Sequence, residues 1–260
     1  MMASHGVRAG DARWLAAVAE LPRNARPATE VTGSITVITG EVGWGSRLRR
    51  AVDDGSVGIV LADPLTASLD ELREADLADR SVPVAIDRPR LRSDVALDAT
   101  PTGNATIHIE VGASRPDLGA VLRDGIGWGR LLAGGELEIV DATTTPRGVL
   151  ALLRRVEASD DRGPSTVTVL ATRGEISAPW IRATVVGAER VEVVVDRRTS
   201  VFRSTEDGVL RLPTRFESTA RLTLRRVIDA VESSGHPNDL AHLRHDSRLA
   251  LDLLSPRPSE

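Results

Sequence analysis

The chain has 260 residues, of which 41% are hydrophobic and 27% are charged, and its formal net charge is −4 at pH 7. This composition is typical of a soluble globular protein. The small negative charge gives no general attraction to nucleic acid or to an anionic membrane surface. No apolar run reaches the roughly 20 residues that a membrane-spanning helix needs. The apolar stretch 14–21 is not followed by a cleavage site of small residues, so the expected location is the cytoplasm.

Several residue types are absent from the sequence. There is no Cys, Lys, Tyr or Gln, so all 33 basic side chains are Arg. Without Cys there is no disulfide, no thiol nucleophile and no thiolate zinc site. Without Lys there is no Schiff base, no phosphate-loop lysine and no lysine general acid. Arg holds anions but is a poor proton donor, which leaves proton transfer to five His residues and the carboxylates.

The first third of the chain alternates between short apolar strands and helices. Ser68 and Glu71 form a capping box that starts one of these helices. Strands that alternate with helices predict a parallel sheet with right-handed crossovers. The expected strands are 34–39, 58–62 and 81–86, and the expected helices are 14–21, 46–54 and 68–78.

Near Arg88 the pattern changes to a period of two, which is typical of an antiparallel sheet with one solvated face. The segment 146–156 is expected to form a crossover helix. The expected strands are 106–111, 166–171, 180–186, 190–195 and 201–204. Two closing helices follow, with apolar faces formed by Leu224, Val227, Ile228 and Val231 and by Leu240, Leu243, Leu249 and Leu253.

These elements predict a fold of the α/β plus α+β class. An incomplete Rossmann-like parallel sheet is expected to form a truncated domain over 1–92. A mostly antiparallel sheet with C-terminal helices is expected to form the domain 93–260.

Three glycines, Gly40, Gly43 and Gly45, lie between an expected strand and an expected helix, where a phosphate-binding loop would sit. Asp63 follows about twenty residues later and would bind the ribose of a dinucleotide. The dinucleotide fingerprint requires a third glycine, which would fall at Leu48. A glycine-rich turn without a phosphate is therefore the preferred interpretation, and a cofactor-binding loop is the alternative.

Three arginines, Arg88, Arg90 and Arg92, follow the third expected strand. Ligands of open α/β sheets bind beyond this end of the strands, so the arginines are candidates to hold a carboxylate or a phosphate. The alternative, which the neighbouring Asp87 and Asp94 favour, is a solvated linker between domains.

A histidine cluster occupies 236–246. His242 and His245 are three residues apart and share a helix face, and Asp239 or Asp246 would complete a metal site. The HExxH spacing is absent, so we assign no metal to this cluster.

The stretch 51–90 resembles one segment of the glucose–fructose oxidoreductase and inositol dehydrogenase family, the Gfo/Idh/MocA group. That family reads A-L-x-x-G-K-x-V-x-x-E-K-P-L, followed by a Ser-capped helix, a V-P-L strand and an Arg. The later half is also similar, with a Gly-rich element, a helix, an antiparallel sheet and a closing helix pair. The matching residues are Ala51, Val52, Gly55, Pro64, Leu65, Ser68, Val82, Pro83 and Arg90.

The departures from the family pattern bear on catalysis. The lysine of the E-K-P motif falls at Asp63, and its glutamate falls at Ala62. The second family motif, G-G-G-x-L-x-D-x-G-x-H-x-x-D, is matched to 134–148, where its histidine becomes Thr143 or Thr145 depending on the register. Since the first expected strand begins at residue 34, too little chain remains for the opening nucleotide-binding unit, and we expect that half to be deleted.

The resemblance and its departures together predict an oxidoreductase-like, non-catalytic protein that binds a small ligand or an oligomeric partner. No catalytic residue is assigned, and no cofactor is expected. The alternative is an active NAD(P)-dependent oxidoreductase that acts on a sugar-like or cyclitol substrate and holds its cofactor with Gly40, Gly43, Gly45 and Asp63. A third hypothesis is a metal-dependent sugar enzyme that uses the C-terminal histidines.

The antiparallel sheet is the expected partner surface. Its outer face is predicted to carry Trp180, Arg182, Val186 and Val194. An aromatic residue and an Arg among aliphatic ones are typical of an interface, and the resembled family assembles through this face. We therefore expect a homodimer, or a complex with a related oxidoreductase, and a monomer with a solvated sheet is the alternative.

Overall fold

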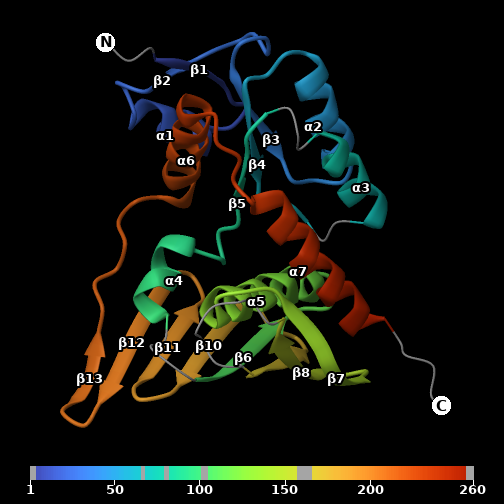
Figure 1. Ribbon diagram of the computed structural model, residues 1–260, viewed down its shortest axis with the longest axis vertical. Coiled ribbons are helices and arrows are strands. Elements are labelled where there is room, and N and C mark those ends of the chain that lie inside the picture. The colour runs from blue at the N-terminus through green and yellow to red at the C-terminus, as the bar shows by residue number, and fades with distance from the viewer. Residues whose placement is uncertain (1–3, 66–67, 79–81, 101–104, 157–165, 256–260) are drawn as a thin grey trace. The chain divides into compact units, whose positions relative to one another are not determined.

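The computed structural model describes residues 4–65, 68–78, 82–100, 105–156 and 166–255, and the chain forms two compact units (Figure 1). The parallel-sheet unit comprises Met1–Pro89 and Phe216–Arg244, and the antiparallel-sheet unit comprises Arg90–Arg215 and His245–Glu260. The predicted boundary after residue 92 lies close to the junction at Arg90. The predicted extent of the second domain, 93–260, needs correction, because 216–244 belongs with the parallel sheet.

The parallel-sheet unit contains five strands in the order β2-β1-β3-β4-β5. All neighbouring strands run parallel. The strands are β1 (His5–Arg8), β2 (Ala25–Pro27), β3 (Ile35–Thr39), β4 (Gly58–Ala62) and β5 (Val84–Asp87). The helices are α1 (Ala12–Ala19), α2 (Trp44–Asp53), α3 (Leu69–Ala78), α6 (Thr219–Ser233) and α7 (Asp239–Leu254), the last of which is divided between the units after Arg244.

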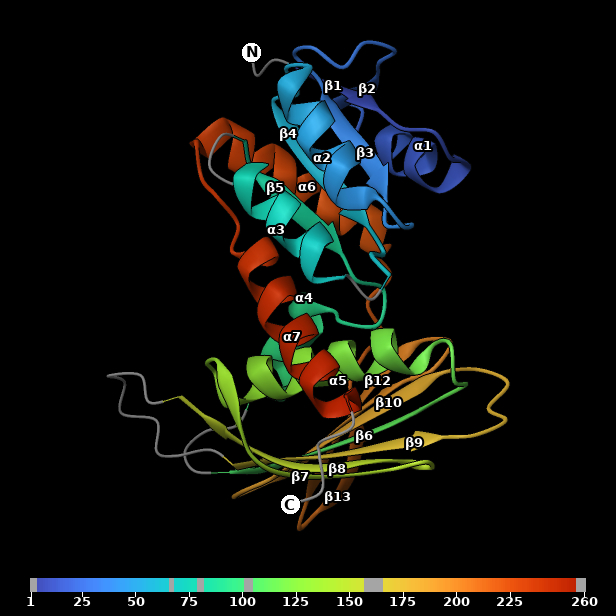
Figure 2. The ribbon, with the colours of Figure 1, turned by 90° about the vertical axis from the view of Figure 1, so that its right-hand side faces the viewer.

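Helices cover both faces of this sheet (Figure 2). Val7 and Ile35 pack with α1 and α6 on one face. Ile38 and Leu61 pack with α2, α3 and the first turns of α7 on the other face. Burial on both faces explains why these strands read as continuous apolar runs. The Rossmann-like parallel sheet is thus confirmed.

The expectation of a deleted nucleotide-binding half is wrong, because β1, α1 and β2 form a βαβ unit ahead of residue 34. Strand β1 has four residues and β2 has three. Segments this short give no periodicity, and Gly6 and Pro27 are both residue types that are depleted in strands. The remaining chain, 28–34, connects β2 to β3 through turns and bends without a helix.

The antiparallel-sheet unit contains eight strands in the order β13-β12-β11-β10-β6-β9-β8-β7. Only the β6–β9 pair runs parallel among the strands of this described sheet. The strands are β6 (Thr106–Ala113), β7 (Leu137–Thr145), β8 (Gly148–Arg155), β9 (Thr166–Arg173), β10 (Trp180–Val186), β11 (Arg190–Val195), β12 (Thr199–Thr205) and β13 (Gly208–Arg211). The helices are α4 (Ser93–Ala99) and α5 (Leu118–Ala133).

The core of this unit lies between the sheet and α5. Ile107, Val169 and Ala183 point inward and are buried, together with Leu122 and Ile126 of α5. The opposite face of the sheet is partly exposed, as the period-2 pattern predicts.

The predicted helix over 146–156 is wrong, because β8 occupies most of these residues. Leu, Ala and Arg favour a helix, but the strand buries Val149, Ala151 and Leu153 while Leu150 and Leu152 are exposed. Pairing with β7 and β9 on both sides therefore overrides the local preference.

Candidate functional site

The carboxyl ends of the parallel strands meet at one edge of the first unit, and the chain changes direction across the sheet between β1 and β3. Strand β1 leads through α1 to β2 on one side, whereas β3 leads through α2 to β4 on the other side. Open α/β sheets bind ligands outside the carboxyl ends of their strands at such a switch point. The loops after β1, β3, β4 and β5 therefore form the candidate site.

The loop 9–11 after β1 occupies the place of a phosphate loop but contains a single glycine, Gly10. The side chain of Asp11 caps α1, and its Oδ1 accepts a hydrogen bond from the backbone N–H of Trp14 at 3.0 Å. A helix N-terminus attracts anions through its free N–H groups. Here a carboxylate of the chain itself occupies that position.

Two more carboxylates lie at the same edge, on Asp63 directly after β4 and on Asp87 at the end of β5. Asp87 is 1% exposed, and Arg13 donates to its Oδ2 at 2.6 Å and to Thr219 Oγ1 at 2.6 Å. Burial raises the pKa of the Asp87 carboxyl, Arg13 and Thr219 oppose this rise, and the charge of Asp63 adds to it. The Oδ1 atom of Asp87 has no hydrogen-bond partner among the described residues.

The loop after β3 contains the three glycines that the sequence singled out. A Cβ at Gly40 would lie 2.2 Å from the Cα of Pro64, so the two loops approach too closely for any side chain. Gly43 has φ of 82°, and its N–H donates to Glu71 Oε1 at 2.6 Å. A Cβ at Gly45 would lie 2.8 Å from the carbonyl oxygen of Glu71. These glycines serve packing, and their contact with a cofactor stays a prediction.

Arg47 stabilises the loop after β3 through hydrogen bonds to its backbone. Its guanidinium donates to the backbone carbonyl oxygens of Thr39 at 2.9 Å, Glu41 at 2.9 Å and Val42 at 3.0 Å. A guanidinium carries five donors in a fixed geometry, and here it satisfies carbonyl groups that lie between the strand and the helix. Arg47 is therefore a structural residue of the loop.

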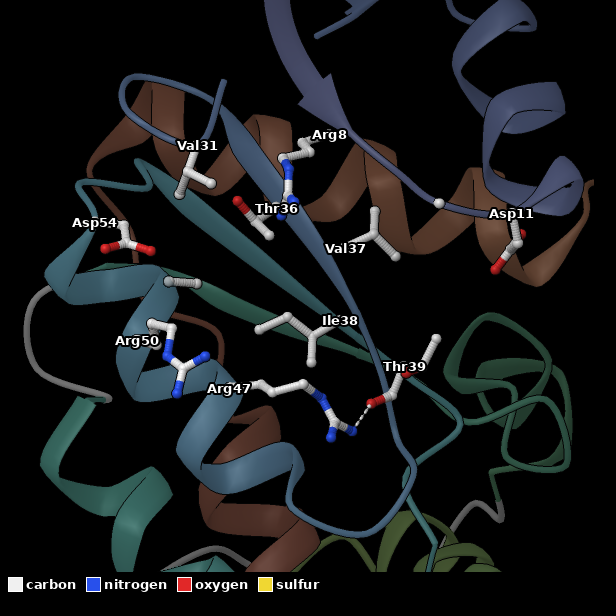
Figure 3. A pocket seen from close by; sticks show the side chains of 12 residues that line it. Arg8, Asp11, Val31, Thr36, Val37, Ile38, Thr39, Arg47, Arg50 and Asp54 are labelled. Atoms are coloured by element: carbon white, nitrogen blue, oxygen red, sulfur yellow. Dashed lines mark hydrogen bonds between the residues drawn. The ribbon is translucent and has the colours of Figure 1, made fainter. Parts of the chain in front are cut away.

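A cavity of about 490 Å³ lies beside β1, β3 and α2 (Figure 3). Arg8 enters it from β1 and Arg50 from α2, and Thr36 and Ile38 of β3 form part of its wall. Both guanidinium-bearing residues are exposed, and neither forms an ion pair or a hydrogen bond within the described part of the chain. The cavity therefore presents uncommitted positive charge next to an apolar surface.

Two of the three arginines after β5 pair with carboxylates of the chain. Arg88 belongs to the parallel-sheet unit and is 7% exposed. Arg90 lies 3.5 Å from Asp124, and Arg92 donates to both carboxylate oxygens of Asp94, at 3.1 Å and 2.7 Å. These ion pairs agree with the linker interpretation, and ligand binding by the three arginines stays a prediction.

The C-terminal histidine cluster is divided among other partners. His245 Nε2 accepts a hydrogen bond from the N–H of Leu137 at 3.1 Å. Asp239 pairs with Arg226 at 2.7 Å, and Asp246 pairs with Arg130 at 2.9 Å. In the described ranges, no three His, Asp or Glu side chains gather to hold a metal ion.

Solved structures share the fold of the whole chain. The dehydrogenase MviM from Clostridium difficile is 10% identical with a TM-score of 0.70, over 96% of this chain and 98% of that one. The 3-ketoreductase KijD10 from Actinomadura kijaniata, solved in complex with NADP, is 18% identical with a TM-score of 0.58, over 95% and 94%. The UDP-N-acetylglucosamine 3-dehydrogenase GnnA from Acidithiobacillus ferrooxidans is 12% identical with a TM-score of 0.59, over 96% of each chain.

The chain has the two-unit fold of the Gfo/Idh/MocA-type dehydrogenases. The resemblance that the sequence indicated is confirmed at the level of the fold. No protein-family model and no curated protein matches the chain. No helix in the part of the chain that the structure describes has the length and apolar composition needed to cross a bilayer.

Acidic side chains lie in the loops that follow β1 and β4 of this fold. Asp63 stands where the resemblance expects the lysine, and its φ of 44° places it in the left-handed region. Asp11 fills the N-terminus of α1. The segment 134–148, matched to the family's histidine motif, lies at the C-cap of α5 and along the β7–β8 hairpin.

The residues around the switch point were not predicted from the sequence. Arg8, Gly10, Asp11 and Arg13 all depend on β1, and β1 was too short to detect. One signal was present, because Asp11 stands three residues before Trp14 at the start of an expected helix, which is the pattern of an N-cap.

Proposed function

We propose that this chain is an oxidoreductase-like protein that binds a small ligand and does not transfer hydride. The observation that carries the proposal is the set of three carboxylates, Asp11, Asp63 and Asp87, at the edge where the fold binds ligands. Arg13 pairs with Asp87 at 2.6 Å, and Asp11 caps the N-terminus of α1. Carboxylates repel a pyrophosphate in the same place.

The chemistry of the chain supports the same conclusion. No lysine exists in the sequence to act as a general acid, and Arg is a poor proton donor. General acid–base assistance contributes about 10² to 10⁴ in rate.

An assay of hydride transfer tests this proposal. The purified chain is incubated with NAD⁺ or NADP⁺ and a set of sugars and cyclitols, and nicotinamide reduction is followed by absorbance. We expect no turnover above the uncatalysed rate. The variant Asp63→Lys, which restores the family's lysine, should also be inactive, because Asp11 still occupies the helix N-terminus. Turnover by the wild type would refute the proposal.

The second candidate function is an active NAD(P)-dependent oxidoreductase. Its support is the likeness in fold to KijD10, which was solved in complex with NADP and matches over 95% of this chain, and the presence of β1, α1 and β2 ahead of β3. If this candidate is correct, Gly40, Gly43, Gly45 and Asp63 hold the cofactor, and Gly10 lies in the loop after β1. Saturable reduction of NADP⁺ that is lost in an Asp63→Ala variant would favour this candidate.

We also propose that the outer face of the antiparallel sheet joins two copies of the chain. Leu150 and Leu170 are paired in register on β8 and β9 and are 52% and 43% exposed. Val186 is 46% exposed on the same face. Light scattering should show a dimer that Leu170→Glu converts to a monomer, while the control Leu97→Glu on α4 does not. A monomeric wild type would contradict the proposal.

A further inference from the structure

The cavity beside β1 and β3 arises from a short connection. Residues 28–34 take the chain from β2 across β1 to β3 without a helix. A crossover between parallel strands usually brings a helix over the sheet. Here the face of β1 next to α2 has no such cover in the described chain, and Arg8 and Thr36 line the resulting space.

We propose that this cavity binds the phosphate monoester of a sugar or nucleoside, with Arg8 and Arg50 on the phosphate. The inference rests on the proposed function, since it names the class of the small ligand. Arg8 and Arg50 are exposed and have no partner in the described residues. Arg47, the third arginine of the wall, is committed to loop carbonyls. Two guanidinium groups are well suited to hold a phosphate through charge-assisted hydrogen bonds.

The rest of the wall suits a ring with hydroxyl groups. Val31, Ile38 and Ala51 supply apolar surface, and Asp54 supplies a carboxylate that accepts hydrogen bonds from hydroxyls. The volume of about 490 Å³ lies within the range of small-molecule sites. A bare inorganic anion would leave the apolar wall and Asp54 unused.

The charge distribution favours one phosphate over two. Asp11 lies at the end of the cavity that opens toward the β1–α1 loop, and its carboxylate caps α1. A second phosphate directed toward that end would meet a negative charge. A monoester keeps its phosphate at the arginines and avoids this repulsion.

Calorimetric titration with adenosine 5′-monophosphate, ribose 5-phosphate and adenosine tests the site. We expect at least one of the two phosphates to bind with a Kd below about 1 mM, and adenosine to bind at least about tenfold more weakly than its monophosphate. Arg8→Gln and Arg50→Gln should each weaken phosphate binding about tenfold, which corresponds to loss of one charged hydrogen bond. The control Arg49→Gln, an exposed arginine of α2 outside the cavity wall, should bind as the wild type does.

Several results would overturn the inference. These are no binding of either phosphate, equal binding of adenosine and its monophosphate, and unchanged binding in both cavity variants. The inference would also fail if Arg49→Gln weakened phosphate binding as much as Arg8→Gln and Arg50→Gln, because the effect would then come from net charge and not from the cavity. Because Arg8 and Arg50 are exposed, circular dichroism should show that all variants fold. Hydride transfer is measured separately, so a chain that reduces NADP⁺ and still binds the monoester through Arg8 and Arg50 would refute the proposed function alone.

Discussion

Two turns of the parallel-sheet unit connect a strand to a helix at the switch point, and both place a carboxylate at the start of the helix. In the β1–α1 turn the carboxylate belongs to Asp11, the capping residue itself. In the β3–α2 turn it belongs to Glu71, which arrives from α3 and accepts the N–H of Gly43. Both turns therefore place a negative charge at a helix N-terminus, the first from the capping residue itself and the second from a residue of another helix.

The two turns show two ways in which a protein can block an anion site at a helix N-terminus. A helix N-terminus is an anion site only while its N–H groups are free. The first turn is closed by one residue and depends little on its surroundings. The second turn is closed by the packing of α2 against α3 at Gly45 and by the close approach of Gly40 to the loop after β4. Substitutions should therefore affect the two turns very differently.

The largest effect should come from Gly40→Ala. The added Cβ would lie 2.2 Å from the Cα of Pro64 and 2.5 Å from the carbonyl oxygen of Asp63, and both are backbone atoms that cannot move aside. We expect a loss of more than about 4 kcal/mol in the free energy of unfolding, measured by urea denaturation. In the other turn, a Cβ at Gly10 meets nothing within 4 Å. Gly10→Ala should therefore stay within about 0.5 kcal/mol of the wild type, and equal losses would show that the turns do not differ.

The next largest effect should come from Glu71→Ala. This change removes the bond to Gly43 at 2.6 Å and the capping-box bond to the N–H of Ser68 at 3.2 Å. We expect a loss of about 2 kcal/mol in thermal or urea unfolding. Asp70→Ala is the matched control, since Asp70 is exposed and only 3.5 Å from the exposed Arg73. A loss in Glu71→Ala as small as in the control would mean that the distant carboxylate does not close the β3–α2 turn.

Asp11→Ala should cost less, about 1 kcal/mol of unfolding free energy, because it removes one helix cap. Asp11→Ser keeps the cap without the charge and should stay within about 0.5 kcal/mol of the wild type. If Asp11→Ser were as unstable as Asp11→Ala, the charge rather than the hydrogen bond would hold this turn together.

The smallest effect concerns pH. Because burial raises the pKa of Asp87 above its ordinary value of 3.8, the folded chain keeps this proton at pH values where the unfolded chain has lost it. The unfolding free energy should therefore fall as the pH rises above 3.8, relative to Asp87→Asn, which has no such proton. Urea unfolding over about pH 3 to 7 measures this difference. Arg13→Gln removes the charge that opposes the rise in the pKa of Asp87, so the unfolding free energy should fall more steeply with pH in this variant. If the unfolding free energy rose with pH relative to Asp87→Asn, the ion pair with Arg13 would outweigh burial.

The sequence predicted the elements whose pattern is local and long enough to detect. The capping box is confirmed, since Ser68 Oγ accepts from Glu71 and Glu71 accepts from Ser68. The core faces of α6 and α7 and the strands β9 to β12 are also confirmed. Strands β1 and β2 were too short for such a pattern. Strand β8 was predicted as a helix because its Leu, Ala and Arg residues favour a helix.

The role of the three predicted glycines could not be derived from the sequence for a related reason. Gly40, Gly43 and Gly45 were visible as a motif, but their role depends on Pro64 and Glu71, which are distant in sequence. The cavity arises from the short 28–34 connection and from the placement of β1 between β2 and β3. No local pattern encodes either feature.

Calorimetric titration of the wild type with NAD⁺ and with adenosine 5′-monophosphate in the same buffer tests whether the chain's own carboxylates close the pyrophosphate positions of this fold. NAD⁺ carries the pyrophosphate without a phosphate monoester, so we predict that it binds at least about tenfold more weakly than the monophosphate, because its pyrophosphate meets Asp11. A micromolar Kd for NAD⁺, tighter than that for the monophosphate, would show that the carboxylates do not close these positions.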